Sequence, residues 1–149
     1  MGSYTQIIYQ IVFSTKYRLK VLTTPHRHQL FDFIGGILKN KRCFIYCING
    51  VEEHIHIVCN LHPSVSLASL VKDIKLASSA FIYENKLFSG FEGWQTGYRA
   101  FTYTIKEKER LIAYVKNQAQ HHKRKLFKEE YIELLKDHGI QYEEKYVFE

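Results

Sequence analysis

Several features are scarce in this chain of 149 residues, and each scarcity excludes a class of protein. There are two prolines and no low-complexity segment, which argues against a largely disordered chain. No apolar run reaches the roughly 18 residues of a membrane-spanning helix, and the first residues lack the basic flank and cleavage site of a secretory signal. The cysteines are odd in number and lie in apolar segments, so we expect reduced, buried thiols in a cytosol at Cys43, Cys47 and Cys59.

What remains is the composition of a folded, basic protein. Hydrophobic residues make up 46% of the chain, charged residues 24% and aromatic residues 15%. The formal charge of +6 includes three basic clusters, "KYRLK", "KNKR" and "HHKRK", at residues 16–20, 39–42 and 121–125. Clustered positive charge favours a polyanionic partner such as a nucleic acid, although a solvated basic surface explains the charge equally well at this point.

Hydrophobic periodicity predicts alternating strands and helices. Residues 6–15 are rich in β-branched and aromatic side chains and indicate a strand, and two more strands within 43–62 are joined at Asn49–Gly50, a strong hairpin signal. The remaining predicted elements are helices over 24–41 and 66–86, a strand over 98–105, and helices over 106–125 and 128–139.

The resulting order, β-α-β-β-α-β-α-α, predicts an α+β fold. Its first six elements match the ferredoxin-like or RRM-like arrangement, an antiparallel four-stranded sheet with helices on one face, to which C-terminal helices are added. We expect one domain over residues 1–149, with a core at about 5–125 and a C-terminal helical extension and tail over about 126–149.

Two histidines stand out in the strand "HIHIVCN". Alternate side chains of a strand point to opposite faces, so His54 and His56 share one face while Ile55, Ile57 and Cys59 form the apolar face opposite. Two neighbouring imidazoles facing away from the core can hold a cation, although half-exposed histidines without a ligand are the commoner case. No second pair of soft ligands completes a zinc site, so a catalytic Mg²⁺ or Mn²⁺ suits the pair better.

The helix predicted over 106–125 carries a second group of polar side chains. Tyr114, Gln118 and His121 are four and three residues apart and therefore share one face of that helix. A tyrosine at a helix edge is more often a packed residue than a nucleophile. Beside a histidine pair, however, a phenol and an amide one turn apart could complete a metal-assisted reaction on a phosphate.

These motifs together resemble the single-tyrosine HUH transposases of insertion-sequence 200/605 elements and their REP-associated relatives. "HIH" at 54–56 fills the His-hydrophobic-His signature, and "YVKNQ" at 114–118 fills the Tyr-x-x-x-Gln signature. "IVFSTKYR" at 11–18 and "WQTGYRAFTYT" at 94–104 resemble the strands that precede them. The sequence departs from the family at Glu53, where aspartate is frequent, and at Gln10, where histidine is common.

The resemblance implies an enzyme that cleaves and rejoins single-stranded DNA. A divalent metal, Mg²⁺ or Mn²⁺, would be bound by His54, His56 and Gln118, and Tyr114 would form a 5′-phosphotyrosine intermediate. Glu53 and His121 would contact the metal ligands rather than the metal itself and hold them in position. No nucleotide cofactor is expected, in agreement with the lack of a phosphate-binding G-x-x-x-x-G-K-[ST] loop.

The resemblance also implies the partners of the protein. These are hairpin-forming single-stranded DNA and a second copy of the chain, with composite active sites and no membrane, in the cytoplasm of a bacterium or archaeon. The residues predicted to contact DNA are the members of the basic clusters Lys16, Arg18, Lys41, Arg42, Lys123, Arg124 and Lys125.

Two other functions remain compatible with the sequence. A non-catalytic nucleic-acid-binding domain can have the same element order, and "YRAFTYT" at 98–104 partly imitates the aromatic pattern of RNA-recognition modules. A small-ligand or metal-sensing domain of ferredoxin-like fold is the third possibility, which the basic charge does not favour.

Overall fold

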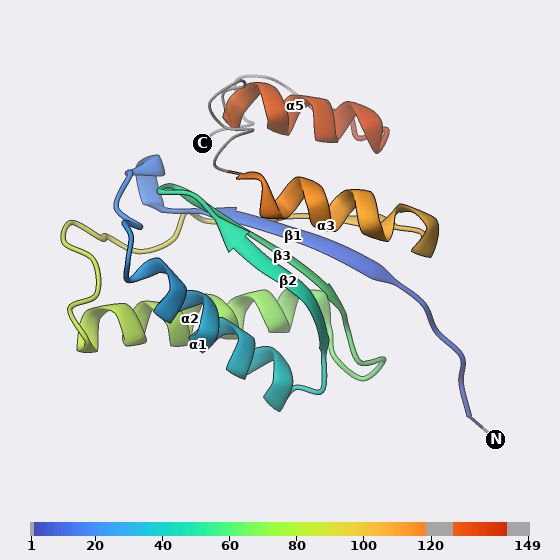
Figure 1. Ribbon diagram of the computed structural model, residues 1–149, viewed down its shortest axis with the longest axis horizontal. Helices are drawn as coiled ribbons and strands as arrows, with labels where there is room; N and C mark the ends of the chain where they lie inside the picture. The colour runs from blue at the N-terminus through green and yellow to red at the C-terminus, as the bar shows by residue number, and fades with distance from the viewer. Residues whose placement is uncertain (1, 119–126, 143–149) are drawn as a thin grey trace.

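A four-stranded antiparallel sheet forms the centre of the computed structural model, which describes residues 2–118 and 127–142 (Figure 1). Its spatial order is β2-β3-β1-β4, as expected for a ferredoxin-like chain. The strands are β1 (Ile8–Ser14), β2 (Phe44–Gly50), β3 (His54–Asn60) and β4 (Arg99–Tyr103). The α-helices are α1 (Arg27–Asn40), α2 (Leu67–Glu84), α3 (Lys108–Lys116) and α5 (Phe127–Asp137), and the short 3-10 helices are η1 (Lys16–Arg18) and η2 (Ile105–Glu107).

Helices α1 and α2 cover one face of the sheet and enclose the main hydrophobic core (Figure 1). The alternation in β3 places Ile55, Ile57 and Cys59 on this face, all fully buried. Burial raises the pKa of the Cys59 thiol to about 12, and the three cysteines are free, as predicted from their apolar surroundings.

Helices α3 and α5 lie on the opposite face (Figure 1). A small cluster holds α3 there, with Leu111 and Val115 packed against Ile8 and Val58 of the sheet. A second cluster of Phe101, Tyr131 and Leu135 holds α5. The predicted sheet and the helices after it are therefore confirmed, and these helices cover the face that the first two leave open. The helix predicted over 106–125 is shorter than expected, because α3 ends at Lys116 and a turn at Asn117 precedes Gln118.

The hairpin between β2 and β3 turns later than the sequence predicts. Asn49 and Gly50 still pair within the sheet, opposite His56 and Ile55, and the chain turns at residues 51–53. Gly50 is nevertheless required, because a Cβ at this position would collide with the carbonyl oxygen of His54. The glycine thus serves a close approach of two strands rather than a two-residue turn.

Two helix boundaries follow local chemistry. Ser66 is the N-cap of α2, where its hydroxyl accepts a hydrogen bond of 3.1 Å from the Ser69 amide. Gly139 follows α5 with a positive φ of 65°, as predicted for a glycine that ends a helix. Among the described residues, no helix is long and apolar enough to cross a membrane.

Candidate active site

The two histidines of β3 lie on the face predicted for them but are completely buried rather than half exposed. His54 and His56 each have 0% of their surface exposed, because α3 and α5 pack over this end of the strand. Their rings lie 5.0 Å apart, centroid to centroid. Two adjacent imidazoles in a fully buried layer are unfavourable as packing, which indicates that they have a chemical task.

Each ring nitrogen of His54 faces a polar side chain. The Nδ1 atom lies 3.8 Å from the carboxylate of Glu53, and the Nε2 atom lies 3.3 Å from the amide oxygen of Gln118. Gln118 follows α3 and is itself 0% exposed. The structure thus brings together two of the predicted metal ligands and the glutamate predicted to support them.

The ring nitrogens of His56 are arranged in the same way. Its Nδ1 atom lies 3.1 Å from the side-chain amide of Gln10, and its Nε2 atom lies 3.5 Å from the carboxylate of Glu130 in α5. The Tyr103 hydroxyl donates a 2.7 Å hydrogen bond to the Gln10 oxygen and so holds the amide in place. Gln10 therefore occupies a supporting position behind His56.

The neighbours of the Nδ1 atoms determine which nitrogens can bind a metal. Glu53 can accept a hydrogen bond from Nδ1 of His54 when that nitrogen carries the proton, which leaves the lone pair of Nε2 for a cation. Gln10 can do the same for His56 if its amide turns over, because the Tyr103 hydroxyl can either donate or accept. Both Nε2 atoms then point toward the same buried region, where Gln118 and Glu130 also present oxygens.

A metal site can be built from these groups. Ligand atoms of His54, His56 and Glu130 all lie within 4.8 Å of one another. Two imidazole nitrogens together with carboxylate and amide oxygens form a mixed donor set. Such a set suits Mn²⁺ or Mg²⁺ better than it suits structural zinc, which is commonly bound through cysteine sulfur. The donor atoms present therefore fit the predicted divalent cation.

Tyr114 lies next to the histidine pair. Its ring centroid is 6.0 Å from that of His56, and its hydroxyl oxygen is buried. The pKa of the phenol is raised well above its usual value, first by burial and then by the charge of Glu130 and a hydrogen bond to that carboxylate. In the arrangement seen here, Tyr114 is thus a neutral phenol held against a carboxylate.

Helix α3 owes its position over the histidines to a residue of β2. The Asn49 side chain donates hydrogen bonds of 2.9 Å and 3.1 Å to the carbonyl oxygens of Val115 and Lys116. Asn49 pairs with His56 across the strands, so this contact aligns the end of α3 with the histidine pair. Tyr114 and the histidines of one and the same chain therefore meet.

The sequence analysis missed Glu130. This carboxylate is 2% exposed and belongs to α5, beyond the last of the motifs quoted for the resemblance, which ends at Gln118. One signal was present, because Glu130 lies four residues before Leu134 and one before Tyr131, on the side of the helix that packs on the protein. A charged residue on the packed side of an amphipathic helix is a reason to look for a partner.

The predicted DNA contacts fall at two ends of the sheet. Lys16 and Arg18 directly follow Ser14, which pairs with His54, so they lie at the end of the sheet that carries the site. Lys41 and Arg42 precede Phe44, at the far end of β2, and Lys41 forms a 2.7 Å ion pair with Asp73 of α2. The structure therefore places these two away from the histidines, on the side of α2.

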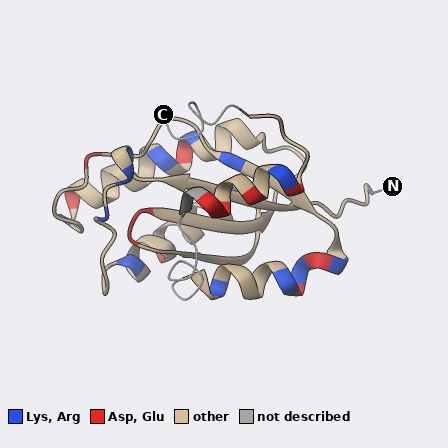
Figure 2. Ribbon diagram, turned by 90° about the horizontal axis from the view of Figure 1, so that it is seen from above, with Lys and Arg blue, Asp and Glu red and all other residues tan. Residues whose placement is uncertain are grey.

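Four of the predicted residues lie outside the described part of the chain: His121, Lys123, Arg124 and Lys125. Charges on the described residues near the site are mixed. Figure 2 shows several acidic positions along α5, which include Glu129, Glu130 and Glu133, while basic positions gather around η1. The charge along α5 is thus mainly negative, whereas a surface that binds a DNA strand is expected to be positive.

Comparison with known proteins identifies the family and the fold. The family model described as "Transposase IS200 like" matches residues 3–118. A transposase candidate from Deinococcus radiodurans R1 is similar in structure, with a TM-score of 0.61 and 20% identity over 79% of this chain and 95% of that chain. A REP-associated tyrosine transposase bound to a REP hairpin has a TM-score of 0.57 and 18% identity over 82% of this chain and 74% of that chain. The search of curated proteins found no match.

Proposed function

Because the chain belongs to the IS200-like transposase family, whose model covers residues 3–118, we propose that it cleaves and rejoins single-stranded DNA through Tyr114. The observation that carries the proposal is the convergence of Tyr114, Gln118 and the two histidines in one buried cluster. A packing role alone does not account for four polar side chains, from two separate segments, that share a single buried region.

The metal ligands in this proposal are His54, His56 and Gln118, and Glu130 joins them only while α5 lies over the site. A bound divalent cation would place positive charge beside a non-bridging oxygen of the scissile phosphate. Glu53 would hold His54 in the tautomer that presents Nε2, and Gln10 would do the same for His56 with its side-chain oxygen turned toward Nδ1.

The chemical step exchanges one phosphodiester bond for another. The Tyr114 oxygen forms a bond to phosphorus, the bond from phosphorus to the 3′ oxygen breaks, and that oxygen leaves with a proton as a 3′-hydroxyl. The phenol gives up one proton to water and the 3′ oxygen takes one from water, so the step balances without a further reactant. Attack of a 3′-hydroxyl on the phosphotyrosine reverses these steps, so strands can be joined without a nucleotide cofactor.

Access to the site requires that α5 moves. The two histidines and Gln118 are fully buried beneath α3 and α5, so no phosphate can reach them in the arrangement described. The cluster that holds α5 is small, and the acidic residues of α5 would repel a DNA backbone. We therefore propose that DNA must displace α5 before cleavage can occur.

The proposed substrate is single-stranded DNA that carries a hairpin. The REP-associated relative in the structural comparison is bound to a REP hairpin, and the basic residues of η1 lie at the same end of the sheet as the site. As in the family, we propose that two copies of the chain act together on such DNA, although the site described here is formed by the residues of one chain.

A labelled oligonucleotide tests the proposal. An imperfect hairpin with single-stranded flanks, taken from DNA next to the gene, is incubated with the protein and Mn²⁺ or Mg²⁺ and analysed on a denaturing gel. We expect a 3′-end label, but not a 5′-end label, to migrate with the protein, because the tyrosine is joined to the 5′ phosphate of the released fragment.

The matched variants are Tyr114→Phe and Tyr46→Phe. We expect Tyr114→Phe to lose the covalent band entirely and Tyr46→Phe, which changes a half-buried tyrosine packed near α3, to retain it. EDTA should abolish the band in both the wild type and Tyr46→Phe. A covalent band that persists in Tyr114→Phe, or that carries the 5′-end label, would show that the proposed nucleophile or polarity is wrong.

A further inference from the structure

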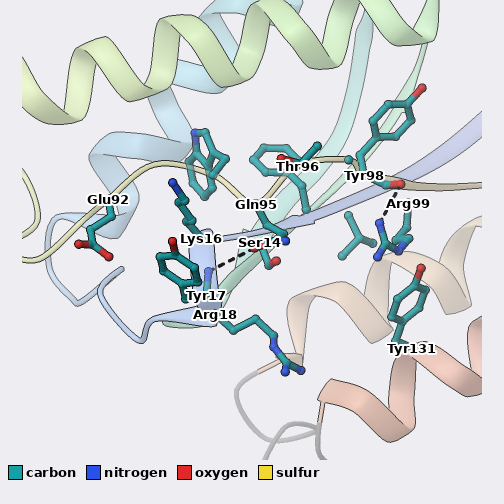
Figure 3. A pocket seen from close by; sticks show the side chains of 14 residues that line it. Ser14, Lys16, Tyr17, Arg18, Glu92, Gln95, Thr96, Tyr98, Arg99 and Tyr131 are labelled. Atoms are coloured by element: carbon teal, nitrogen blue, oxygen red, sulfur yellow. Dashed lines mark hydrogen bonds between the residues drawn. The ribbon is translucent and has the colours of Figure 1, made fainter. Parts of the chain in front are cut away.

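A cavity of about 470 Å³ opens beside the buried histidines, between the end of β1, η1 and the segment that leads into β4 (Figure 3). This volume is within the range of small-ligand sites in proteins. We call it the η1 pocket, and its charged and aromatic lining includes Lys16, Tyr17, Arg18, Trp94, Arg99 and Tyr131.

The η1 pocket lies on the same face of the sheet as the candidate active site. Ser14 and Val12 line the pocket and pair with His54 and His56, while Arg99 pairs with Val12 on its other side. Side chains of directly paired residues point to the same face. His56, Val12 and Arg99 therefore form a row across three strands, and two strand spacings separate the histidine from the arginine by about 10 Å.

The lining combines positive charge with aromatic rings. Lys16, Arg18 and Arg99 line the pocket, and Glu92 is the one acidic residue among the described residues that form it. The Arg99 guanidinium lies 4.5 Å from the centre of the Tyr131 ring, and the Tyr17 side chain remains 70% exposed at the mouth. Cations bind a phosphate, and exposed rings stack on a base, so both halves of a nucleotide find a complement here.

The wall that carries Tyr17 and Arg18 is held in an unusual backbone conformation. Both residues have positive φ angles, 59° and 53°, which are rare for residues other than glycine. The Lys16 amide donates a 2.9 Å hydrogen bond to the Gly93 carbonyl, and the Tyr17 amide donates one of 3.2 Å to the Gln95 side chain (Figure 3). A strained turn fixed in this way is typical of a binding site.

The opposite wall is anchored independently. Trp94 forms a bridge to Thr15 and stacks edge-on against Phe13, at 4.9 Å between ring centroids. Lys75 of α2 donates hydrogen bonds to the carbonyl oxygens of Gln95 and Gly97. The two walls formed by η1 and by residues 94–97 are therefore in place before any ligand arrives and do not depend on α5, which reduces the entropy lost on binding.

We propose that the η1 pocket binds one unpaired nucleotide of the DNA strand, adjacent to the phosphate that reacts at the histidine pair. The base stacks on Tyr17, and Arg18 with Lys16 contacts the backbone phosphate. The location of the reacting phosphate rests on the proposed function, whereas the pocket itself does not. A base in a duplex cannot stack on Tyr17 without leaving its own helix, so this pocket selects single-stranded DNA.

Binding in EDTA tests the pocket without any cleavage. The probe is a fluorescein-labelled oligothymidylate of about 15 nucleotides, compared by anisotropy with an abasic strand of the same length. We expect Tyr17→Ala to weaken oligothymidylate binding about tenfold and to leave abasic binding unchanged, since only the stacked base is lost. We expect Arg18→Gln to weaken both probes and to lower the slope of log K against log salt by about 0.7.

The controls lie elsewhere on the molecule. Lys72 and Tyr83 are exposed residues of α2, which covers the other face of the sheet, and Tyr83 is 54% exposed. Lys72→Gln and Tyr83→Ala should bind both probes like the wild type. Three results would overturn the proposed nucleotide pocket. They are equal losses of binding in the control variants, weaker binding of the abasic strand by Tyr17→Ala, and a wild type that binds neither probe.

The outcome is separable from that of the cleavage assay. If the η1 variants weaken binding while no covalent band forms with Tyr114, the nucleotide pocket stands and the proposed chemistry fails. If the covalent band forms but the η1 variants bind oligothymidylate like the wild type, the chemistry stands and the pocket fails.

Discussion

The two faces of the sheet are built from the same strands but bury different kinds of side chain. On the face covered by α1 and α2, β3 contributes Ile55 and Ile57 to a large, continuous apolar core. On the face covered by α3 and α5, the same strand contributes His54 and His56 to a polar cluster, with two small apolar clusters beside it. Both faces are buried, but only the face under α1 and α2 has an extensive, continuous apolar core.

This difference indicates where the molecule can change shape. A large apolar core resists opening, because exposing it costs free energy in proportion to the buried area. A polar cluster under a helix held by three buried residues, Phe101, Tyr131 and Leu135, costs far less to open. The arrangement would let the histidine face open to DNA, when α5 moves, without loss of the core on the other side.

The largest expected effect tests the apolar face. Ile57→Ala should lower the free energy of unfolding by about 2–5 kcal/mol, because it removes a fully buried side chain and leaves a cavity. Ile105→Ala, at an isoleucine that is 50% exposed, should change it by less than about 0.5 kcal/mol. Urea denaturation measures both, and similar values for the two variants would contradict the distinction between the faces.

A smaller effect is expected on the polar face. In EDTA, His56→Leu should be destabilised, because the Glu130 carboxylate keeps its burial but loses the imidazole 3.5 Å away. The double variant with Glu130→Leu should be about 1–4 kcal/mol more stable than His56→Leu, since an apolar pair replaces a buried polar one.

Metal addition separates stability from function in the same pair. Mn²⁺ should raise the melting temperature of the wild type and leave that of the double variant unchanged, because ligand binding stabilises only a fold that retains its site. A double variant no more stable than His56→Leu, or one stabilised by Mn²⁺ like the wild type, would show that these two groups are not paired around a cation.

The smallest expected effect concerns the residue behind the metal ligands. Glu53→Gln should weaken Mn²⁺ binding about tenfold, measured by titration calorimetry, because the carboxylate 3.8 Å from His54 Nδ1 increases the basicity of that ring. Its neighbour Glu52 is exposed and serves as the control, so Glu52→Gln should bind Mn²⁺ like the wild type. If both variants bind Mn²⁺ with equal affinity, Glu53 has no role in the metal site.

Much of the fold follows from local patterns. Strict alternation in "HIHIVCN" assigns the two faces of β3 correctly, and helical spacing finds α2 with its Ser66 cap. The turn between β2 and β3 was misplaced, because Asn49–Gly50 is a frequent hairpin signal, whereas here the glycine is needed where His54 passes close by. That requirement comes from the neighbouring strand, and no local rule contains it.

The candidate site was predictable only in part, for a similar reason. The sequence determined that His54 and His56 share a face and that Gln118 lies about one helical turn beyond Tyr114, because those relations depend only on the repeat of a strand and of a helix. It did not show that α3 ends at Lys116, before Gln118. The tertiary structure decided that the two pairs meet, that Lys41 and Arg42 lie at the far end of the sheet, and that Glu130 reaches the histidines from a helix outside the matched region. Local repeats fix the direction of a side chain within its own element, whereas contacts between elements depend on how the whole chain packs.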